Sequence, residues 1–218
     1  MLAENTEAAP AAKTNHHAAF FRQSSWMMIA TVTGGAMMAG VHVLSKKITE
    51  DEYAIFGALV ALISCVPTMP LQMVFAQQTA AALATNRERQ LANMIRQAWF
   101  WSFLLWFAGA VGAWIFQGRI VQAWGLSTPF TLFLALVAML FALWQPLFMG
   151  VLQGRQNFFW FGWVYILGGV IRLGVAALIV LALHSGAVGM MVGVVAGLAV
   201  TIVIPIWHNR DLLWLGAE

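Results

Sequence analysis

Six long runs of apolar residues constrain this chain more than any other feature of its sequence. Each run has about twenty residues or more, the length that an α-helix needs to cross a hydrocarbon layer about 30 Å thick. Strands of a membrane β-barrel would instead alternate polar and apolar residues, and a backbone inside lipid must satisfy its own hydrogen bonds. We therefore expect an all-α, polytopic membrane protein. The six transmembrane helices are predicted at residues 24–44, 53–82, 97–116, 129–152, 158–183 and 187–207.

Composition supports this class and excludes others. Hydrophobic residues make up 61% of the chain and charged residues only 9%, which is not the composition of a soluble domain. The net charge of +3 is small and dispersed, so nucleic-acid binding is not expected. We divide the chain into a disordered cytoplasmic tail (residues 1–21), a six-helix lobe (residues 22–210) and a C-terminal tail (residues 211–218).

Basic residues between the runs predict the orientation. If the N-terminus is cytoplasmic, seven basic residues lie on the inner side and three on the outer side, which favours cytoplasmic N- and C-termini. The inner residues are then Lys13, Arg22, Arg87, Arg89, Arg96, Arg155 and Arg210, and the outer ones are Lys46, Lys47 and Arg119.

Arg172 is the only charged residue inside any of the six runs. A guanidinium at bilayer depth costs at least ~2.5–3.5 kcal/mol, so it marks a functional site by default. On a helical wheel Arg172 shares a face with Tyr165, Gly168, Gly169 and Ala176, which indicates that it points into the bundle. No Asp or Glu lies in any run. Its counter-charge must come from backbone or amide oxygens, water, a partner outside this chain, or an anionic ligand.

Prolines and amides interrupt two of the runs. Pro67 and Pro70 lie in the middle of the second run, where each removes a backbone donor. Two interpretations stay open: a kinked structural helix, or a hinge that lines a polar cavity, as in transporters with broken helices. Gln72 follows in the same run, and Gln145 with Pro146 repeats the theme in the fourth. A mid-span glutamine must bond either a neighbouring helix or a substrate.

The sixth run carries Gly189, Gly193 and Gly197 at four-residue spacing. This spacing places the glycines on one helix face and lets another helix approach closely. The three residues are therefore predicted to serve helix packing. No enzyme, cofactor or metal-binding motif is apparent in the sequence, so we expect neither catalysis nor a cofactor.

Three stretches resemble a known family: LSKKITEDEYAIFGALVALI, PLQMVFAQQTA and GVLQGRQNFFWFGWVYILGGVIRLGVAALIVL. They resemble the polysaccharide-transport branch of the multidrug/oligosaccharidyl-lipid/polysaccharide exporter superfamily, over most of residues 22–210. The resemblance implies two six-helix lobes around a central cavity in a bacterial inner membrane. This chain looks like the N-terminal half, so a second lobe is the implied partner.

That resemblance also implies a function: flipping polyprenyl-diphosphate-linked oligosaccharide from the inner to the outer leaflet. Arg172 would attract the diphosphate, while Gln145 and Gln72 would contact polar groups of this lipid-linked ligand. Related drug exporters often hold a coupling carboxylate in their first helices, and none exists here. Two alternatives stay open: half of a multidrug exporter, or a membrane scaffold that pairs through the glycine-rich face.

Overall fold

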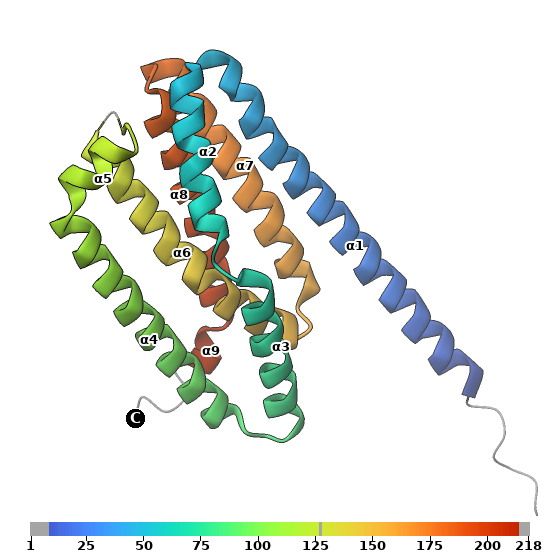
Figure 1. Cartoon of the computed structure of the whole chain (residues 1–218). Coiled ribbons are helices and arrows are strands. Elements are labelled where there is room, and N and C mark those ends of the chain that lie inside the picture. Colours follow the sequence, from blue (N-terminus) through green and yellow to red (C-terminus); the bar gives the residue numbers. More distant parts are fainter. Residues whose placement is uncertain (1–8, 127, 214–218) are drawn as a thin grey trace, which may run out of the picture.

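The structure, a computed structural model, describes residues 9–126 and 128–213, and within these ranges its regular elements are helices (Figure 1). The elements are α1 (Ala9–Val43), the 3-10 helix η1 (Leu44–Lys47), α2 (Glu50–Ser64), α3 (Thr68–Ala84), α4 (Glu88–Ile115), α5 (Gln117–Ala123), α6 (Pro129–Gly154), α7 (Phe158–Leu183), α8 (Gly186–His208) and α9 (Arg210–Leu213).

Six stretches of the described residues are long and apolar enough to cross a membrane. They are Arg22–Val43, Glu50–Ala84, Glu88–Ile115, Pro129–Gly154, Phe158–Leu183 and Gly186–His208. Each of them overlaps one of the predicted spans. The all-α, six-helix membrane fold predicted from the sequence is thus confirmed.

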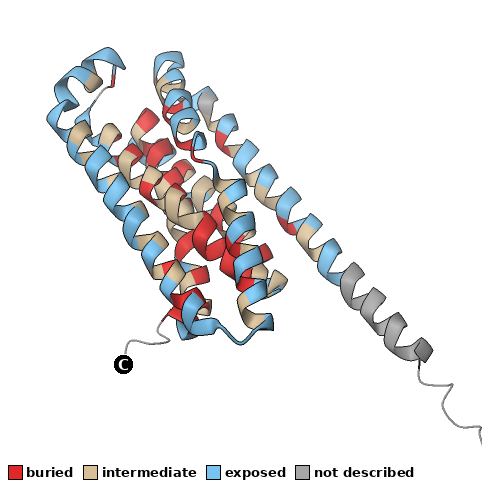
Figure 2. Ribbon diagram, turned by 60° about the horizontal axis from the view of Figure 1, so that its bottom comes forward, coloured by how far each residue is buried: buried red, intermediate tan, exposed pale blue. Residues whose placement is uncertain are grey.

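Helices α6 and α8 form the centre of the bundle (Figures 1 and 2). In the most apolar 18-residue segment of α6 and of α8, half of the residues are buried. In the corresponding segment of α4, none of the residues is buried. Helix α7 packs on α8 and carries α1 on its other side, while α4 lies along α6 at the opposite edge. The outward face of α4 exposes Trp101, Leu105 and Trp114, as expected for side chains that meet lipid.

The second span is two helices rather than one kinked helix. Helix α2 ends at Ser64 and α3 begins at Thr68, after Pro67. Pro67 has no N–H to continue the helical ladder, whereas Pro70 lies in the first turn of α3, where a missing N–H leaves no bond unmade. The Ser64 hydroxyl, in the last turn of α2, donates to the carbonyl oxygen of Val60 at 2.8 Å.

Both predicted tails are partly helical in the structure. Residues 9–21, expected in a disordered tail, form the first turns of α1, since their alanine-rich sequence favours a helix. Residues 210–213 form α9, where Leu212 and Leu213 are buried against Leu91 of α4. The rest of the two predicted tails, residues 1–8 and 214–218, lies outside the described residues.

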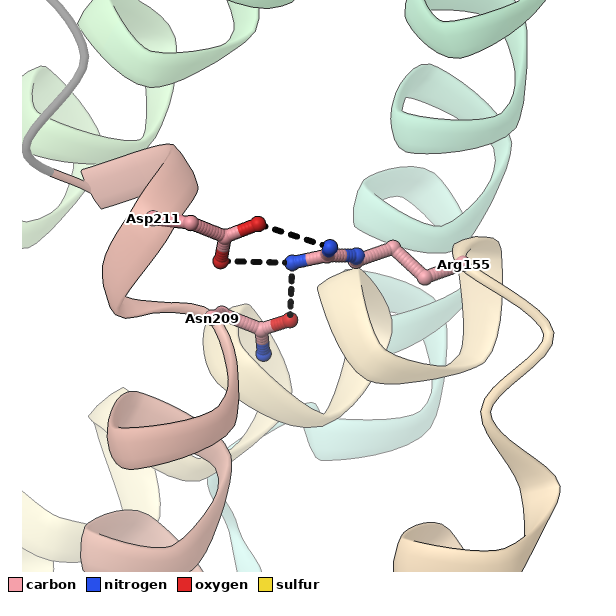
Figure 3. Close-up of polar contacts among 3 residues, drawn as sticks. All are labelled: Arg155, Asn209 and Asp211. Atoms are coloured by element: carbon pink, nitrogen blue, oxygen red, sulfur yellow. Dashed lines mark hydrogen bonds and ion pairs between the residues drawn. The ribbon is translucent and has the colours of Figure 1, made fainter.

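Arg155, at the end of α6, binds residues that follow α8 and lie far from it in the sequence (Figure 3). Its two terminal nitrogens each donate to one carboxylate oxygen of Asp211 at 2.8 Å, and Nη1 also donates to Oδ1 of Asn209 at 3.3 Å. This hydrogen bonding raises the pKa of Arg155 and lowers the pKa of Asp211 below its ordinary value of 3.8. The ion pair thus fixes α9 to the α6–α7 connection.

The Arg155–Asp211 pair predicts an acid-dependent contribution to stability. Because the pKa of Asp211 is lowered in the folded chain, the contribution is complete above pH 3.8 and is lost as the pH falls through the lowered pKa. Asp211 is well exposed, so the effect of Asp211→Asn should stay below about 1 kcal/mol. We expect this variant to have a lower Tm than wild type at about pH 7 and an equal Tm at about pH 2. An equal Tm difference at both pH values would contradict the assignment.

The connections of the bundle fall into two groups (Figure 1). The described start and end of the chain lie at one end with the α3–α4 and α6–α7 connections, which carry Arg87 and Arg155. The opposite end holds η1 with Lys47, and α5 with Arg119. The basic residues assigned to the inner side from the sequence therefore gather at one end of the bundle, and cytoplasmic termini stay a prediction.

Single-cysteine labelling tests this orientation. In a Cys65→Ser background, an impermeant thiol reagent added to intact cells should label Lys47→Cys and Arg119→Cys but not Arg89→Cys. Permeabilised cells serve as the control, because all three variants should then react. Labelling of Arg89→Cys alone in intact cells would reverse the orientation.

Candidate functional site

A cavity of about 470 Å³ opens in the middle of the bundle, bounded by α1, α2, α3, α6, α7 and α8. Its lining comprises Thr31, Gly34, Gly35, Met38, Val60, Ile63, Ser64, Val66, Thr68, Ala142, Gln145, Tyr165, Gly168, Gly169, Arg172, Val194, Gly197, Leu198 and Thr201. Most of these residues are apolar or small. The polar groups among them are therefore concentrated at a few positions.

Arg172 lies on the wall that α7 contributes to this cavity. Tyr165, Gly168 and Gly169 line the cavity beside it, which is the face that the helical wheel predicts. Leu178, on the opposite side of α7, is 67% exposed at the outer surface. The single charge of the six apolar runs thus faces the interior of the bundle.

The guanidinium of Arg172 has little to compensate its charge. Nη1 donates to the sulfur of Met38 at 3.4 Å, and a thioether is a weak acceptor. Nε is buried without a hydrogen-bond partner among the described residues. The lining of the cavity contains no carboxylate. An unpaired donor in such a place costs ~1–3 kcal/mol, more for a charged group, so the site is suited to receive an acceptor.

Gln145 reaches the same cavity from α6, whereas Gln72 does not line it. Nε2 of Gln72 donates instead to Oε1 of Gln153 at 2.8 Å, a bond that joins α3 to α6. The structure therefore brings together Arg172 and Gln145 among the predicted substrate-binding residues. The third, Gln72, is engaged in a helix-to-helix contact.

The break between α2 and α3 is part of the cavity wall. Ser64, Val66 and Thr68, which flank Pro67 in sequence, all line the cavity. Of the predicted hinge prolines, Pro67 and Pro70 lie at this break, while Pro146 is buried within α6 next to Gln145. A change of direction at the α2–α3 break would therefore reshape the cavity.

Two further polar residues of the lining, Thr31 and Thr201, were not singled out from the sequence. Thr201 continues the four-residue spacing of Gly193 and Gly197, so it lies on the face that packs on α7. Thr31 lies one helical turn before Gly34 and Gly35 on α1. The positions of these threonines relative to the glycines were the signal available in the sequence.

The glycines of α8 set the position of Arg172. A Cβ atom on Gly193 would lie 2.6 Å from the carbonyl oxygen of Arg172, and one on Gly197 would lie 2.7 Å from the Cβ of Arg172. Gly189 similarly meets Val180 of α7. The glycine face of α8 is thus occupied by α7 of the same chain, directly behind the arginine.

No protein-family model and no curated protein matches the sequence. Among solved structures, the chain is similar to a transporter of the MOP superfamily from Pyrococcus furiosus, whose binding pocket is described as having reverse polarity that suggests a different function. The TM-score is 0.69 at 13% sequence identity, and the match covers 90% of this chain. The chain has the fold of part of a MOP transporter. It spans 44% of the length of that protein, and at this identity the likeness concerns the fold.

The contact between α7 and α8 predicts sensitivity to a single methyl group. Gly193→Ala should lower stability by about 1–3 kcal/mol, because the new Cβ would press on the backbone of Arg172. Gly174→Ala, on the same pair of helices, is the matched control, since nothing lies within 4 Å of its Cβ position. It should be neutral or slightly stabilising, because alanine favours the helix. Equal Tm values for the two variants in detergent would contradict the packing.

Proposed function

We propose that this chain is one lobe of a MOP-type membrane transporter that flips a lipid-linked oligosaccharide, with its diphosphate, from the inner to the outer leaflet of a bacterial inner membrane. The observation that carries the proposal is the position of Arg172. Its guanidinium lies in the central cavity, and its buried Nε has no hydrogen-bond acceptor among the described residues.

The chemistry of the cavity favours an anionic ligand. A guanidinium presents planar, paired donors that match the oxygens of a phosphate, and it keeps its charge under all physiological conditions. Gln145 on the facing helix α6 offers both a donor and an acceptor to sugar hydroxyls or phosphate oxygens. A cavity whose lining includes a cation and no carboxylate disfavours cationic drugs, which weakens the multidrug-exporter alternative.

The reverse-polarity pocket of the Pyrococcus furiosus transporter supports the same line of reasoning. For that protein, the polarity of the binding pocket is described as suggesting its function. In this chain the polarity comes from Arg172, and we infer the ligand class from it rather than from the fold.

The size of the cavity supports a second lobe as partner. Pockets for drug-sized ligands measure about 300–1,000 Å³, so a cavity of about 470 Å³ would hold only part of a lipid-linked oligosaccharide. A facing lobe would supply the remaining volume. The match to 44% of a larger transporter is compatible with this arrangement.

The scaffold alternative loses the surface on which it depended. It requires the face of Gly189, Gly193 and Gly197 to be available for another chain, and α7 covers that face.

The break between α2 and α3 supports alternating access, because it lies in the wall of the cavity. Irregular backbone at membrane depth is tolerated where it lines a cavity.

Substitution of Arg172 tests the proposal. Arg172→Ala should abolish export per inserted molecule, a loss of at least about 100-fold, because the diphosphate would lose its charged partner. Arg172→Lys should recover part of it, since lysine keeps the charge and loses the paired donors. Export of lipid-linked sugar is measured in cells that depend on the full-length protein, and is divided by the amount of protein in the membrane.

Arg119→Ala, at the far end of the bundle, is the control and should export normally. Tm values of all variants separate loss of ligand binding from loss of folding. Unchanged export per molecule in Arg172→Ala would refute the ligand role. A fall in both Tm and membrane level that accounts for the whole loss of export would make Arg172 structural.

A further inference from the structure

A second cavity, of about 410 Å³, lies at the end of the bundle that holds the α6–α7 connection. It shares no lining residue with the cavity around Arg172. Its lining comprises Arg22, Gln23 and Trp26 of α1, together with Gln156, Asn157, Phe158 and Phe159 at the start of α7. The transport function proposed above does not use these residues.

The lining combines one cation, three amides and three aromatic rings. Arg22 is exposed, and its guanidinium has no ion-pair or hydrogen-bond partner among the described residues. The lining contains no carboxylate. Phosphate oxygens are the acceptors that a guanidinium with neighbouring amide donors binds best.

The aromatic part of this cavity is held in place before any ligand arrives. The indole Nε1 of Trp26 donates to the carbonyl oxygens of Phe158 at 3.1 Å and Phe159 at 3.2 Å. The rings of Trp26 and Phe159 also stack, with centroids 5.8 Å apart and planes inclined by 20°. These contacts fix α1 against the first turn of α7, so the cavity between them is preorganised.

Gln156 occupies the left-handed position that follows α6. Its φ of 57° lies in the left-handed region, where glycine is favoured and a glutamine is costly. The conformation ends α6, because the backbone N–H groups of Gln156 and Asn157 donate to the carbonyl oxygens of Gln153 at 2.9 Å and Leu152 at 3.1 Å. Here the side chain of Gln156 contributes an amide to the lining of the cavity.

The position of the cavity relative to the apolar spans decides between a soluble and a lipid ligand. Arg22 lies at the start of the candidate membrane span of α1, and Phe158 lies at the start of that of α7. Both residues therefore lie at the same end of their spans, where we expect a membrane surface. The following turn of α1 exposes Met28, Ile29 and Val32, each more than half accessible, to the surroundings of the bundle. A ligand with a phosphate and acyl chains would suit this arrangement, because its phosphate would lie near the ends of the spans and its acyl chains along the exposed apolar side chains.

We propose that this cavity binds the phosphate headgroup of an anionic phospholipid from the leaflet at this end of the bundle. Arg22 pairs with the phosphate, and the amides of Gln23 and Gln156 donate to its oxygens. The stacked rings of Trp26 and Phe159 contact the glycerol and the upper acyl chains. The site joins α1 to α7 through lipid as well as through protein, apart from the transport cavity.

The test uses the full chain in nanodiscs of phosphatidylcholine, with phosphatidylglycerol added in increasing fraction. Bound phosphatidylglycerol is counted by native mass spectrometry, and Tm is recorded in parallel. Wild type should retain phosphatidylglycerol and gain Tm. Arg22→Gln should weaken retention about five-fold, as expected for one basic residue near an anionic surface, with an unchanged Tm in pure phosphatidylcholine.

Arg119→Gln, at the opposite end, is the matched control and should retain phosphatidylglycerol as wild type does. Soluble glycerol phosphate should not compete at millimolar concentration. Equal retention by wild type and Arg22→Gln would overturn the site. Full competition by glycerol phosphate would show a phosphate site without lipid specificity, and would overturn the proposal as well.

Gln156→Gly provides a second variant that does not depend on the folding of Arg22→Gln. Removing the strain at φ 57° should leave Tm in phosphatidylcholine unchanged or higher. Retention of phosphatidylglycerol should fall nevertheless, because the amide is lost. A higher Tm with undiminished retention would remove Gln156 from the site, and, together with full retention in Arg22→Gln, would leave no ligand function for this cavity.

Discussion

Close approach of helix backbones through glycine is the interaction on which this bundle depends. In lipid, apolar side chains gain little by meeting one another, so helices associate through van der Waals contact of small residues. Three helix pairs use it here: Gly193 and Gly197 against α7, Gly169 against Gly34 of α1, and Gly150 against α3. A Cβ on Gly150 would lie 2.6 Å from the carbonyl oxygen of Gln72. These contacts hold α1, α7 and α8 together in series, and they hold α3 against α6.

The central cavity follows from where such contacts are missing. Helix α1 packs on α7, and α3 packs on α6, but the broken span between them leaves volume in front of α7 and α8. Arg172 occupies that volume because α8 presses on its backbone from behind, which leaves the side chain one direction in which to extend. The packing of small residues thus determines where the one charge of the apolar spans is presented.

The six spans, the inward face of Arg172 and the glycine spacing were all predictable, because each is a local period of one helix. What the sequence left open depends on residues far apart along the chain. The Arg155–Asp211 ion pair joins positions 56 residues apart, and the Gln72–Gln153 bond joins positions 81 apart. The packing of Trp26 on the start of α7, 132 residues away, was equally hidden. Whether two prolines kink a helix or divide it also depends on the neighbours that receive each half.

That division has a consequence for how the lobe can deform. Phe56, Leu59 and Ile63 of α2 belong to one hydrophobic cluster, whereas Phe75 of α3 belongs to another that also includes α4 and α9. Helices α6 and α8 contribute residues to both clusters. The break at Pro67 coincides with the seam between these two clusters. A rotation about this break would change the angle between α2 and α3 while both clusters stayed assembled. The energetic barrier to reshaping the cavity would then depend on the short irregular backbone at residues 65–67, and not on the repacking of a core.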